Sequence, residues 1–288
     1  MLDILFIVYL EWIKNMLPEI NIFGFAVDMY TVWIVFGIIV CLIFTIFAMK
    51  KCGYSATATD AIIIIGILST ILGFLFAMLF QAIYDFLSDP SVGFRINGGM
   101  TFIGGLIGGV VVFLGLYFLY VYVINPRLKD GNFFKSDMNK GVWYFLRIAP
   151  ISITIAHAFG RIGCLFAGCC HGHETDAWYG VWSHNANAVV VPTQLFESIF
   201  LFVLSAVLFV MLFVFHLKDT LAVYLVSYGI WRFIIEYFRA DYRGSFIPGL
   251  SPSQFWSIIM VLLGIAAFFL YRYFDKKFEN KEKETQVQ

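Results

Sequence analysis

Two arginines lie on one stripe of a stretch that is otherwise apolar. At helical spacing, Tyr228, Arg232, Glu236 and Arg239 share a face. A charged side chain in hydrocarbon costs a few kcal/mol, so such a residue is by default paired or functional. Because one carboxylate cannot neutralise two guanidinium groups, the excess positive charge would suit a phosphate, which guanidinium binds bidentately. A structural ion pair that joins helices is the alternative.

A third arginine belongs to a second apolar stretch. His157, Arg161 and Cys164 are spaced to share one face of a helix. Gly160 and Gly163, between them, would let a backbone or a ligand approach closely. Arg161 therefore adds a further positive charge near the membrane interior, and snorkelling of its side chain to the interface is the alternative.

A glycine-rich segment could bind an anion. Gly98 and Gly99 precede a predicted helix at 101–124, and exposed N–H groups at the start of a helix bind anions. Gly104 and Gly105 are each followed by another glycine four residues later, a spacing that is also typical of tight helix packing.

Gln194 and Glu197 lie one turn apart, near the start of a further apolar segment. We interpret them as polar groups at the outer mouth of the membrane region. Helix capping is the alternative for both residues.

The remaining candidate ligands are Cys164, Cys169, Cys170, His171 and His173. Adjacent cysteines reach one ion less easily than a C-x-x-C pair does, and no second ligand pair stands elsewhere in the sequence. We therefore predict no metal site and no cofactor. A disulfide in an outer loop and plain packing are the two alternatives for these cysteines.

Composition shows which elements must position these residues. Of 288 residues, 61% are hydrophobic and 13% are charged, far more apolar than a soluble domain. The net charge is zero, so nothing indicates a nucleic-acid partner. Apolar stretches long enough to cross a bilayer predict seven transmembrane helices and an all-α integral membrane protein, at 29–49, 61–84, 101–124, 144–167, 195–216, 221–238 and 254–273.

The basic residues predict the orientation of these helices. They gather after Met49, between Ile124 and Arg147, around Lys218 and beyond Tyr271. The positive-inside rule places these segments in the cytoplasm. We therefore expect the N-terminus outside and the C-terminus in the cytoplasm.

Three regions follow from these patterns. Residues 1–20 carry charges among apolar residues and resemble a signal peptide poorly, so we predict a helix that lies in the membrane interface. Residues 21–275 form the predicted membrane domain. Residues 276–288 are predicted to be a charged cytoplasmic tail.

Four motifs, taken in order, resemble the prolipoprotein diacylglyceryl transferase family. They are Gly98–Gly105, Gly160–Gly163, Pro192–Glu197 and Arg232–Arg239, and the likeness spans residues 24–274. The resemblance implies an enzyme of the bacterial cytoplasmic (inner) membrane. Such an enzyme moves the diacylglyceryl group of phosphatidylglycerol onto the lipobox cysteine thiol of a secreted prolipoprotein and releases glycerol phosphate.

The resemblance also implies roles for the charged residues. Arg161 and Arg232 would hold the lipid phosphate and stabilise charge on the departing oxygen. Arg239, Glu197 and Glu236 would orient these two arginines. The residues expected to contact substrate are Tyr30, Gly98, Gly99, Gly104, Gly105, Gln194 and His157.

Two positions depart from the family pattern. Ile103 stands where the family usually has a histidine, and Cys164 stands where it has an asparagine. A free thiol is mostly protonated at neutral pH, so its activation would depend on His157, Glu197, Glu236 or the arginines. The departures leave one alternative, a divergent paralogue that uses another group or acceptor. A second alternative is a non-enzymatic transporter or lipid-binding membrane protein whose arginines only hold lipid headgroups.

Overall fold

Seven helices of the computed structural model are long and apolar enough to cross a membrane, among the residues it describes. This confirms the predicted all-α membrane fold. The structure describes residues 19–22, 24–96, 99–124, 127, 132–240 and 249–287, without the side chains of residues 22, 88, 92, 102, 103, 132–144 and 274–287. The spanning segments are Met29–Lys51, Ala56–Leu87, Gly104–Ile124, Phe145–Phe166, Thr193–Phe213, Thr220–Phe238 and Pro252–Tyr273.

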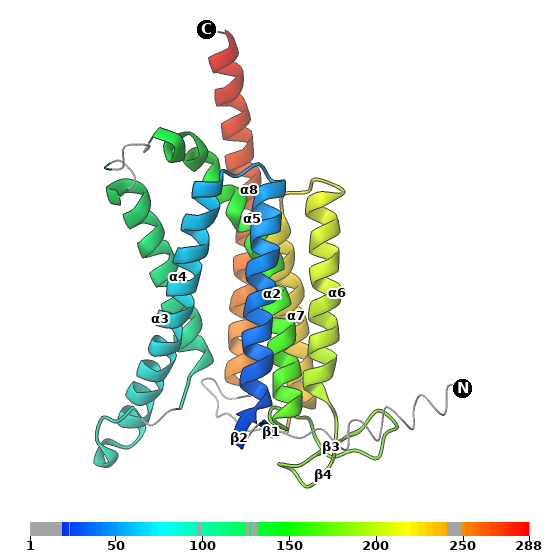
Figure 1. The fold of residues 1–288 in the computed structure, drawn as a ribbon. Helices are drawn as coiled ribbons and strands as arrows, with labels where there is room; N and C mark the ends of the chain where they lie inside the picture. The colour runs from blue at the N-terminus through cyan, green and yellow to red at the C-terminus, as the bar shows by residue number, and fades with distance from the viewer. Residues whose placement is uncertain are drawn as a thin grey trace. The chain divides into compact units, whose positions relative to one another are not determined.

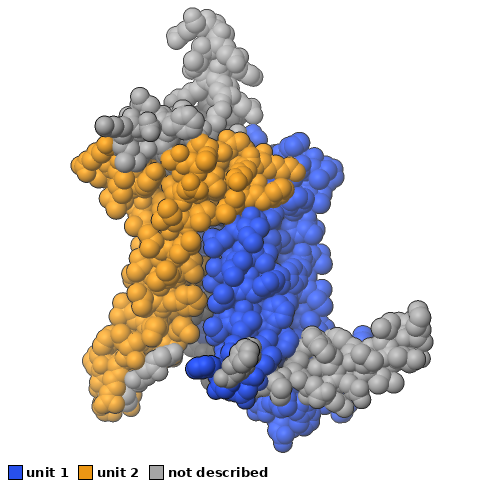
Figure 2. Space-filling view, in the orientation of Figure 1, with its two compact units in different colours: residues 1–44, 146–288 blue, residues 45–145 orange. Residues whose placement is uncertain are grey.

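The chain divides into two compact units, one of residues 1–44 and 146–288 and the other of residues 45–145 (Figure 2). Helices α2 and α5 contribute to both units. The elements in chain order are β1 (Glu19–Ile22), β2 (Phe25–Asp28), α2 (Met29–Lys51), α3 (Ala56–Ser88), η1 (Pro90–Val92), α4 (Phe102–Leu119), η2 (Tyr120–Ile124), α5 (Asn132–Phe166), β3 (Val181–Ser183), β4 (Ala188–Val190), α6 (Thr193–Phe213), α7 (Thr220–Ile235), η4 (Glu236–Phe238) and α8 (Pro252–Val287).

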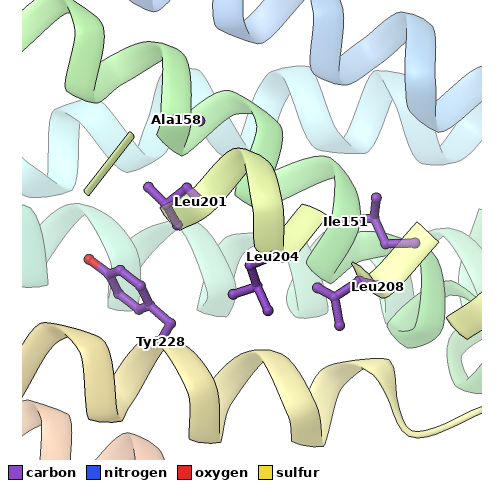
Figure 3. Close-up of a cluster of buried hydrophobic side chains, with 6 residues drawn as sticks. All are labelled: Ile151, Ala158, Leu201, Leu204, Leu208 and Tyr228. Carbon is purple, nitrogen blue, oxygen red and sulfur yellow. The ribbon is translucent and has the colours of Figure 1, made fainter. Parts of the chain in front are cut away.

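The first unit is a bundle in which α6 and α7 run beside the second half of α5 (Figure 1). Its core joins Ile151 and Ala158 of α5 to Tyr228 of α7 and three leucines of α6 (Figure 3). Leu201 and Leu208 are fully buried there. Because this packing holds the three helices together, the polar residues near their ends are positioned against one another.

Small residues bring α7 and α8 into close contact. A Cβ added at Gly229 would lie 2.8 Å from Val261 Cγ2 and 3.0 Å from the Ser257 carbonyl oxygen. A Cβ at Gly264 would lie 2.7 Å from Val226 Cγ2. Glycine at both positions therefore allows the start of α8 to lie beside the end of α7.

Helix starts in this unit carry recognisable caps. The Thr31 amide and hydroxyl both donate to Asp28 Oδ2, at 3.0 Å and 2.7 Å, at the start of α2. The hydrogen bond from the Thr31 hydroxyl lowers the pKa of the Asp28 carboxyl below its usual value. At the start of α8, Ser251 Oγ accepts from the Gln254 amide and Gln254 Oε1 accepts from the Ser251 amide, which is a capping box.

Two short hairpins lie at the end of the first unit where α6 begins (Figure 1). Strands β1 and β2 pair with Glu19 opposite Asp28, and β3 pairs with β4. The predicted interfacial helix over 1–20 falls outside the described residues except for its last two, which begin β1 rather than a helix. Helix α5 begins at Asn132, well before the predicted span, and α8 continues through the predicted tail to Val287.

Candidate active site

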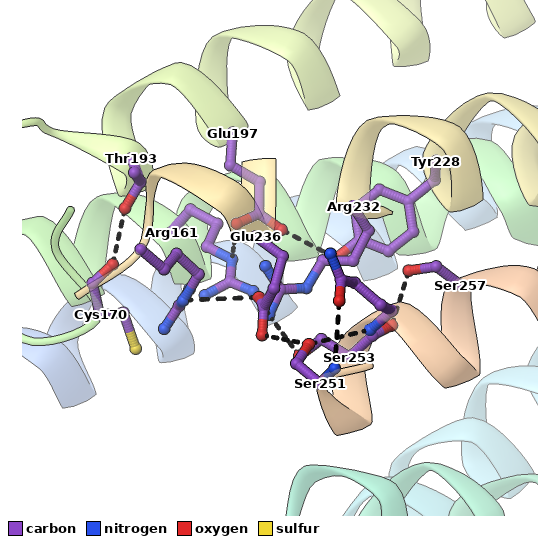
Figure 4. Close-up of polar contacts among 12 residues, drawn as sticks. Arg161, Cys170, Thr193, Glu197, Tyr228, Arg232, Glu236, Ser251, Ser253 and Ser257 are labelled. Atoms are coloured by element: carbon purple, nitrogen blue, oxygen red, sulfur yellow. Dashed lines mark hydrogen bonds and ion pairs between the residues drawn. The ribbon is translucent and has the colours of Figure 1, made fainter. Parts of the chain in front are cut away.

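A fully buried carboxylate, Glu197, joins three helices at one end of the first unit (Figure 4). Its Oε2 lies 3.0 Å from Arg161 Nε of α5. Its Oε1 accepts a 2.8 Å hydrogen bond from the Tyr228 hydroxyl of α7 and lies 3.9 Å from His157 Nε2. The predicted face of His157 and Arg161 therefore meets the predicted stripe of α7 at Glu197.

Glu236 forms a second centre beside the start of α8. Its Oε2 lies 2.9 Å from Arg232 Nη2 and 3.7 Å from Arg239 Nε, and its Oε1 accepts a 2.9 Å hydrogen bond from Ser251 Oγ. Arg232 Nη2 also donates to Ser253 Oγ at 2.8 Å. The α7 stripe thus binds α8 through two serines (Figure 4).

The two centres are electrostatically one cluster. Glu197 contacts both Arg161 and Tyr228, and Arg232 follows Tyr228 one turn later on the same face of α7, so Arg161 and Arg232 lie on the same side of the bundle. Among the described residues, the cluster holds three guanidinium groups and two carboxylates, which together leave one positive charge in excess. Arg232 Nη1 is buried and has no hydrogen-bond partner among the described residues. Such a donor in a water-poor place is suited to an anionic ligand.

Helix α6 also anchors the loop that follows α5. Gln194 Nε2 donates to the Cys169 carbonyl and Thr193 Oγ1 donates to the Cys170 carbonyl, each at 2.7 Å. The capping alternative for Gln194 and Glu197 is wrong, because α6 has no side-chain cap and Pro192 occupies the capping position. Instead, Gln194 fixes the loop and Glu197 pairs with Arg161.

Three thiols converge in this loop. The sulfur atoms of Cys164, Cys169 and Cys170 all lie within 4.8 Å of one another, and none of the five cysteines, all of them described, forms a disulfide. Hydrogen bonds from the thiols of Cys164 and Cys169, together with the Arg239 guanidinium, lower the pKa of the Cys170 thiol. The same hydrogen bonding raises the pKa of the Cys169 thiol.

Tyr30 begins α2 beside the end of α5. A Cβ added at Gly163 would lie 3.1 Å from the Tyr30 carbonyl oxygen and 3.2 Å from its ring Cδ2. Glycine at this position therefore lets α2 and α5 approach closely, as expected for a small residue where two helices meet. Because Gly163 follows Arg161 by two residues, this contact places Tyr30 near the arginine cluster.

The glycine-rich motif belongs to the second unit. A Cβ at Gly104 would lie 2.5 Å from Phe80 Cβ, and a Cβ at Gly105 would lie 3.2 Å from Ala77 Cβ. The tight packing that the spacing of these glycines indicates is thus confirmed, between α4 and α3. A Cβ at Gly99 would lie 2.9 Å from Gln81 Cγ, while Gly98 lies outside the described residues.

Comparison with known proteins decides the family. The family model described as prolipoprotein diacylglyceryl transferase matches residues 19–270. The chain belongs to this family.

Several relatives are similar along almost their whole length. The phosphatidylglycerol–prolipoprotein diacylglyceryl transferase of Clostridium tetani is 30% identical over 262 residues, covering 88% of this chain and 96% of that protein. The enzyme of that name numbered 2 in Clostridium perfringens is 32% identical over 260 residues, covering 86% and 92%. That of Dehalococcoides mccartyi is 28% identical over 277 residues, covering 92% and 96%.

Membership of the prolipoprotein diacylglyceryl transferase family confirms the resemblance that the four motifs carry. In this member, three hydroxyl groups contact the charged residues of the cluster. The sequence alone did not assign these three hydroxyl groups to the site. They belong to Tyr228, Ser251 and Ser253. Tyr228 was detectable from its place on the stripe, and Ser251 from the Ser-x-x-Gln pattern that begins α8.

Proposed function

We propose that this protein transfers the diacylglyceryl group of phosphatidylglycerol to a prolipoprotein cysteine. Its clostridial relatives are named phosphatidylglycerol–prolipoprotein diacylglyceryl transferases. The observation that carries the proposal is the excess positive charge of the cluster, with three guanidinium groups and two carboxylates among its described residues. A phosphodiester headgroup brings the one negative charge that this cluster lacks.

Arg161 and Arg232 are the proposed phosphate ligands. Both are largely buried, with 15% and 9% of their side chains exposed, so water screens their charge weakly. Arg232 uses Nη2 for Glu236 and Ser253, and its buried Nη1 is available for a phosphate oxygen. Donors that are already oriented stabilise charge on a departing oxygen without reorganising during the reaction.

In the proposed reaction, the carbon of the diacylglyceryl group that carries the phosphate exchanges its bond to oxygen for a bond to sulfur. The acceptor sulfur attacks this carbon, the carbon–oxygen bond to phosphate breaks, and glycerol phosphate leaves with the bonding electron pair. The thiol proton passes to a base and then to solvent. The products are a thioether and glycerol phosphate, so atoms and charge balance.

His157 is the proposed base for the acceptor thiol. Its side chain is 17% exposed, whereas Glu197 is fully buried and already pairs with Arg161 and Tyr228. Glu236 likewise holds two arginines. The carboxylates, with Arg239, are therefore positioning residues in this proposal, and a neutral imidazole is the group able to accept a proton.

Tyr30 and Gln194 complete the proposed substrate site in the first unit. Tyr30 and Gln194 lie at the end of the first unit that carries the arginines. The basic loops predict that this end faces the outside of the bacterial cytoplasmic membrane, where a secreted prolipoprotein would present its lipobox cysteine. Gly98, Gly99, Gly104 and Gly105 stay proposed contacts of the lipid headgroup.

A reconstituted transfer assay tests the function. Purified protein is mixed with phosphatidylglycerol and a lipobox peptide with one cysteine, and the thioether product and released glycerol phosphate are both measured. Controls replace the lipid by phosphatidylethanolamine and the acceptor cysteine by serine. Equal amounts of the two products, only with both substrates, are expected. Bound phosphatidylglycerol recovered unchanged would instead identify a lipid-binding protein.

Departures at Ile103 and Cys164 favour testing one further candidate, a paralogue with a different acceptor. Lipid analysis of cells with and without the gene distinguishes the two functions. Loss of prolipoprotein modification without the gene, restored by its expression, supports the first. Consumption of phosphatidylglycerol with no change in lipoproteins would support the second.

A further inference from the structure

The end of α5 folds back so that cysteines separated in sequence meet. The Cys169 amide donates to the Cys164 carbonyl at 3.2 Å and the Gly168 amide donates to the Leu165 carbonyl at 3.1 Å. With Gly168 at φ +64°, these two bonds form a Schellman motif, which regularly brings the side chains on either side of the turn into contact. Here those two side chains are Cys164 and Cys169, so a standard helix end pairs two thiols.

The third thiol joins this pair through an unusual backbone. Cys170 has φ +63°, a conformation that residues other than glycine seldom adopt. Its sulfur lies within 4.8 Å of both others. Three sulfurs around one ion at about 2.3 Å would stand about 4 Å apart, so they need to move by less than an ångström to share a ligand.

Hydrogen bonds from three directions fix this loop. The Cys169 and Cys170 carbonyls accept from the Gln194 and Thr193 side chains. The Gly168 carbonyl accepts from Ser183 Oγ at 3.2 Å. Beyond the cysteines, the Gly172 amide donates to the Val191 carbonyl at 2.8 Å. The thiols are therefore held in place before any ligand arrives, which lowers the entropic cost of binding one.

The ligand set selects the kind of ion. It consists of three sulfurs, and among the described residues no histidine, aspartate or glutamate belongs to the same group. All-thiolate sites prefer soft ions such as Cu⁺ and Zn²⁺. Protein sites for structural Zn²⁺ are almost always four-coordinate, so three thiols fit Cu⁺ better.

Neighbouring charges favour a metal–thiolate complex here. Three thiolates around Cu⁺ carry a charge of −2, since binding releases three protons to solvent. The Arg239 guanidinium donates a hydrogen bond to the Cys170 thiol, and the positive charge of Arg161 interacts electrostatically with the Cys164 sulfur. Two guanidinium groups thus stand beside sulfurs that become anionic when they bind the ion.

We propose that Cys164, Cys169 and Cys170 bind one Cu⁺ ion through their three thiolates. None of the three thiols has a role in the proposed transfer reaction, whereas Arg161 borders both the thiols and the proposed phosphate site.

Metal content of the purified full-length chain tests this inference. Protein in detergent, reduced and anaerobic, receives Cu⁺ from a competing chelator, and bound copper and free thiols are then counted. One ion per chain is expected, with Cys164, Cys169 and Cys170 protected from alkylation. The matched control is the Cys41→Ser/Cys52→Ser variant, which keeps the cluster and is expected to bind as tightly as the unaltered chain.

The single variants Cys164→Ser and Cys170→Ser are expected to lose at least about tenfold in Cu⁺ affinity, as loss of an essential ligand implies. Thermal unfolding without metal shows whether they are folded. If serine misfolds the loop, alkylation protection in the unaltered chain still decides. Copper bound equally by the triple serine variant, thiols that alkylate fully with copper present, or Zn²⁺ that displaces Cu⁺ at equal concentration would each overturn the proposal.

Discussion

Replacing Arg232 by alanine tests the excess-charge argument directly. Glu236 pairs with Arg232 at 2.9 Å, but it also contacts Arg239 at 3.7 Å and Ser251 at 2.9 Å. The Arg232→Ala variant therefore keeps partners for Glu236. It leaves two guanidinium groups and two carboxylates in the described cluster, whose net charge falls from +1 to zero. We expect the variant to insert and fold, and to lose its affinity for the lipid phosphate.

The expected loss follows from the two N–H groups that one guanidinium can direct at a phosphate. A hydrogen bond to a charged group contributes about 1.5–3 kcal/mol, so two contribute roughly 3–6 kcal/mol. Since about 1.4 kcal/mol is a factor of ten in rate, kcat/KM should fall by about 10²–10⁴-fold. Arg232→Lys keeps the charge without the planar fork, so we expect a loss of about 10–100-fold, as for one such bond.

The assay is the initial rate of peptide modification at varied phosphatidylglycerol concentration. A fall in kcat would place the Arg232 contact in the transition state, and a rise in KM alone would place it in ground-state binding. Arg272→Ala is the matched control, because Arg272 is exposed on α8 and lies over the Phe268 ring at 4.4 Å. Activity of Arg232→Ala within about threefold of the unaltered protein would refute the phosphate argument.

Four further substitutions at three positions test the framework, three of them by thermal unfolding in detergent and Ser251→Asp by the transfer assay. Glu197→Gln strands a buried Arg161 and is expected to cost about 3–5 kcal/mol; an unchanged melting temperature would contradict the pairing. Ser251→Ala removes the cap of α8 and should lower the free energy of unfolding by about 0.5–2 kcal/mol. Ser251→Asp keeps a good capping residue but should place a second carboxylate beside Glu236, so we expect slower transfer. Gly229→Ala should cost about 1–3 kcal/mol through overpacking against Val261, and a stabilised variant would show that the two helices are not so close.

Hydropathy predicted the spanning helices well because the bilayer imposes both length and composition. The first predicted span, 29–49, corresponds to α2 at Met29–Lys51. Polar residues define the ends of an apolar stretch but do not end a helix, so α5 begins at Asn132 and α8 reaches Val287. Hydropathy therefore located the part of each helix that crosses the membrane, and not the whole helix.

Periodicity predicted which charges share a face, and packing decided which faces meet. The stripe of Tyr228, Arg232 and Glu236 was readable because these residues are four apart. That Glu197 of α6 would contact Arg161 was implied only by the family resemblance, since no local pattern specifies the partner of a buried charge. We expected one carboxylate to leave guanidinium groups in excess. The structure adds a second carboxylate, Glu197, but this carboxylate pairs with a third arginine, Arg161, so an excess of one positive charge remains.

The cysteines show a pattern that spacing rules miss. Cys164, Cys169 and Cys170 lie near one another in the sequence, but no two of them form a C-x-x-C pair, so the spacing rule predicts no metal site. The relevant pattern is instead a cysteine in the last turn of a helix, a glycine four residues later and a cysteine directly after it, because a Schellman turn brings the two cysteines together. Gly168, at φ +64°, is thus as necessary to the cluster as the sulfurs. The three thiols therefore converge in the folded chain, although their spacing in the sequence argues against a metal site.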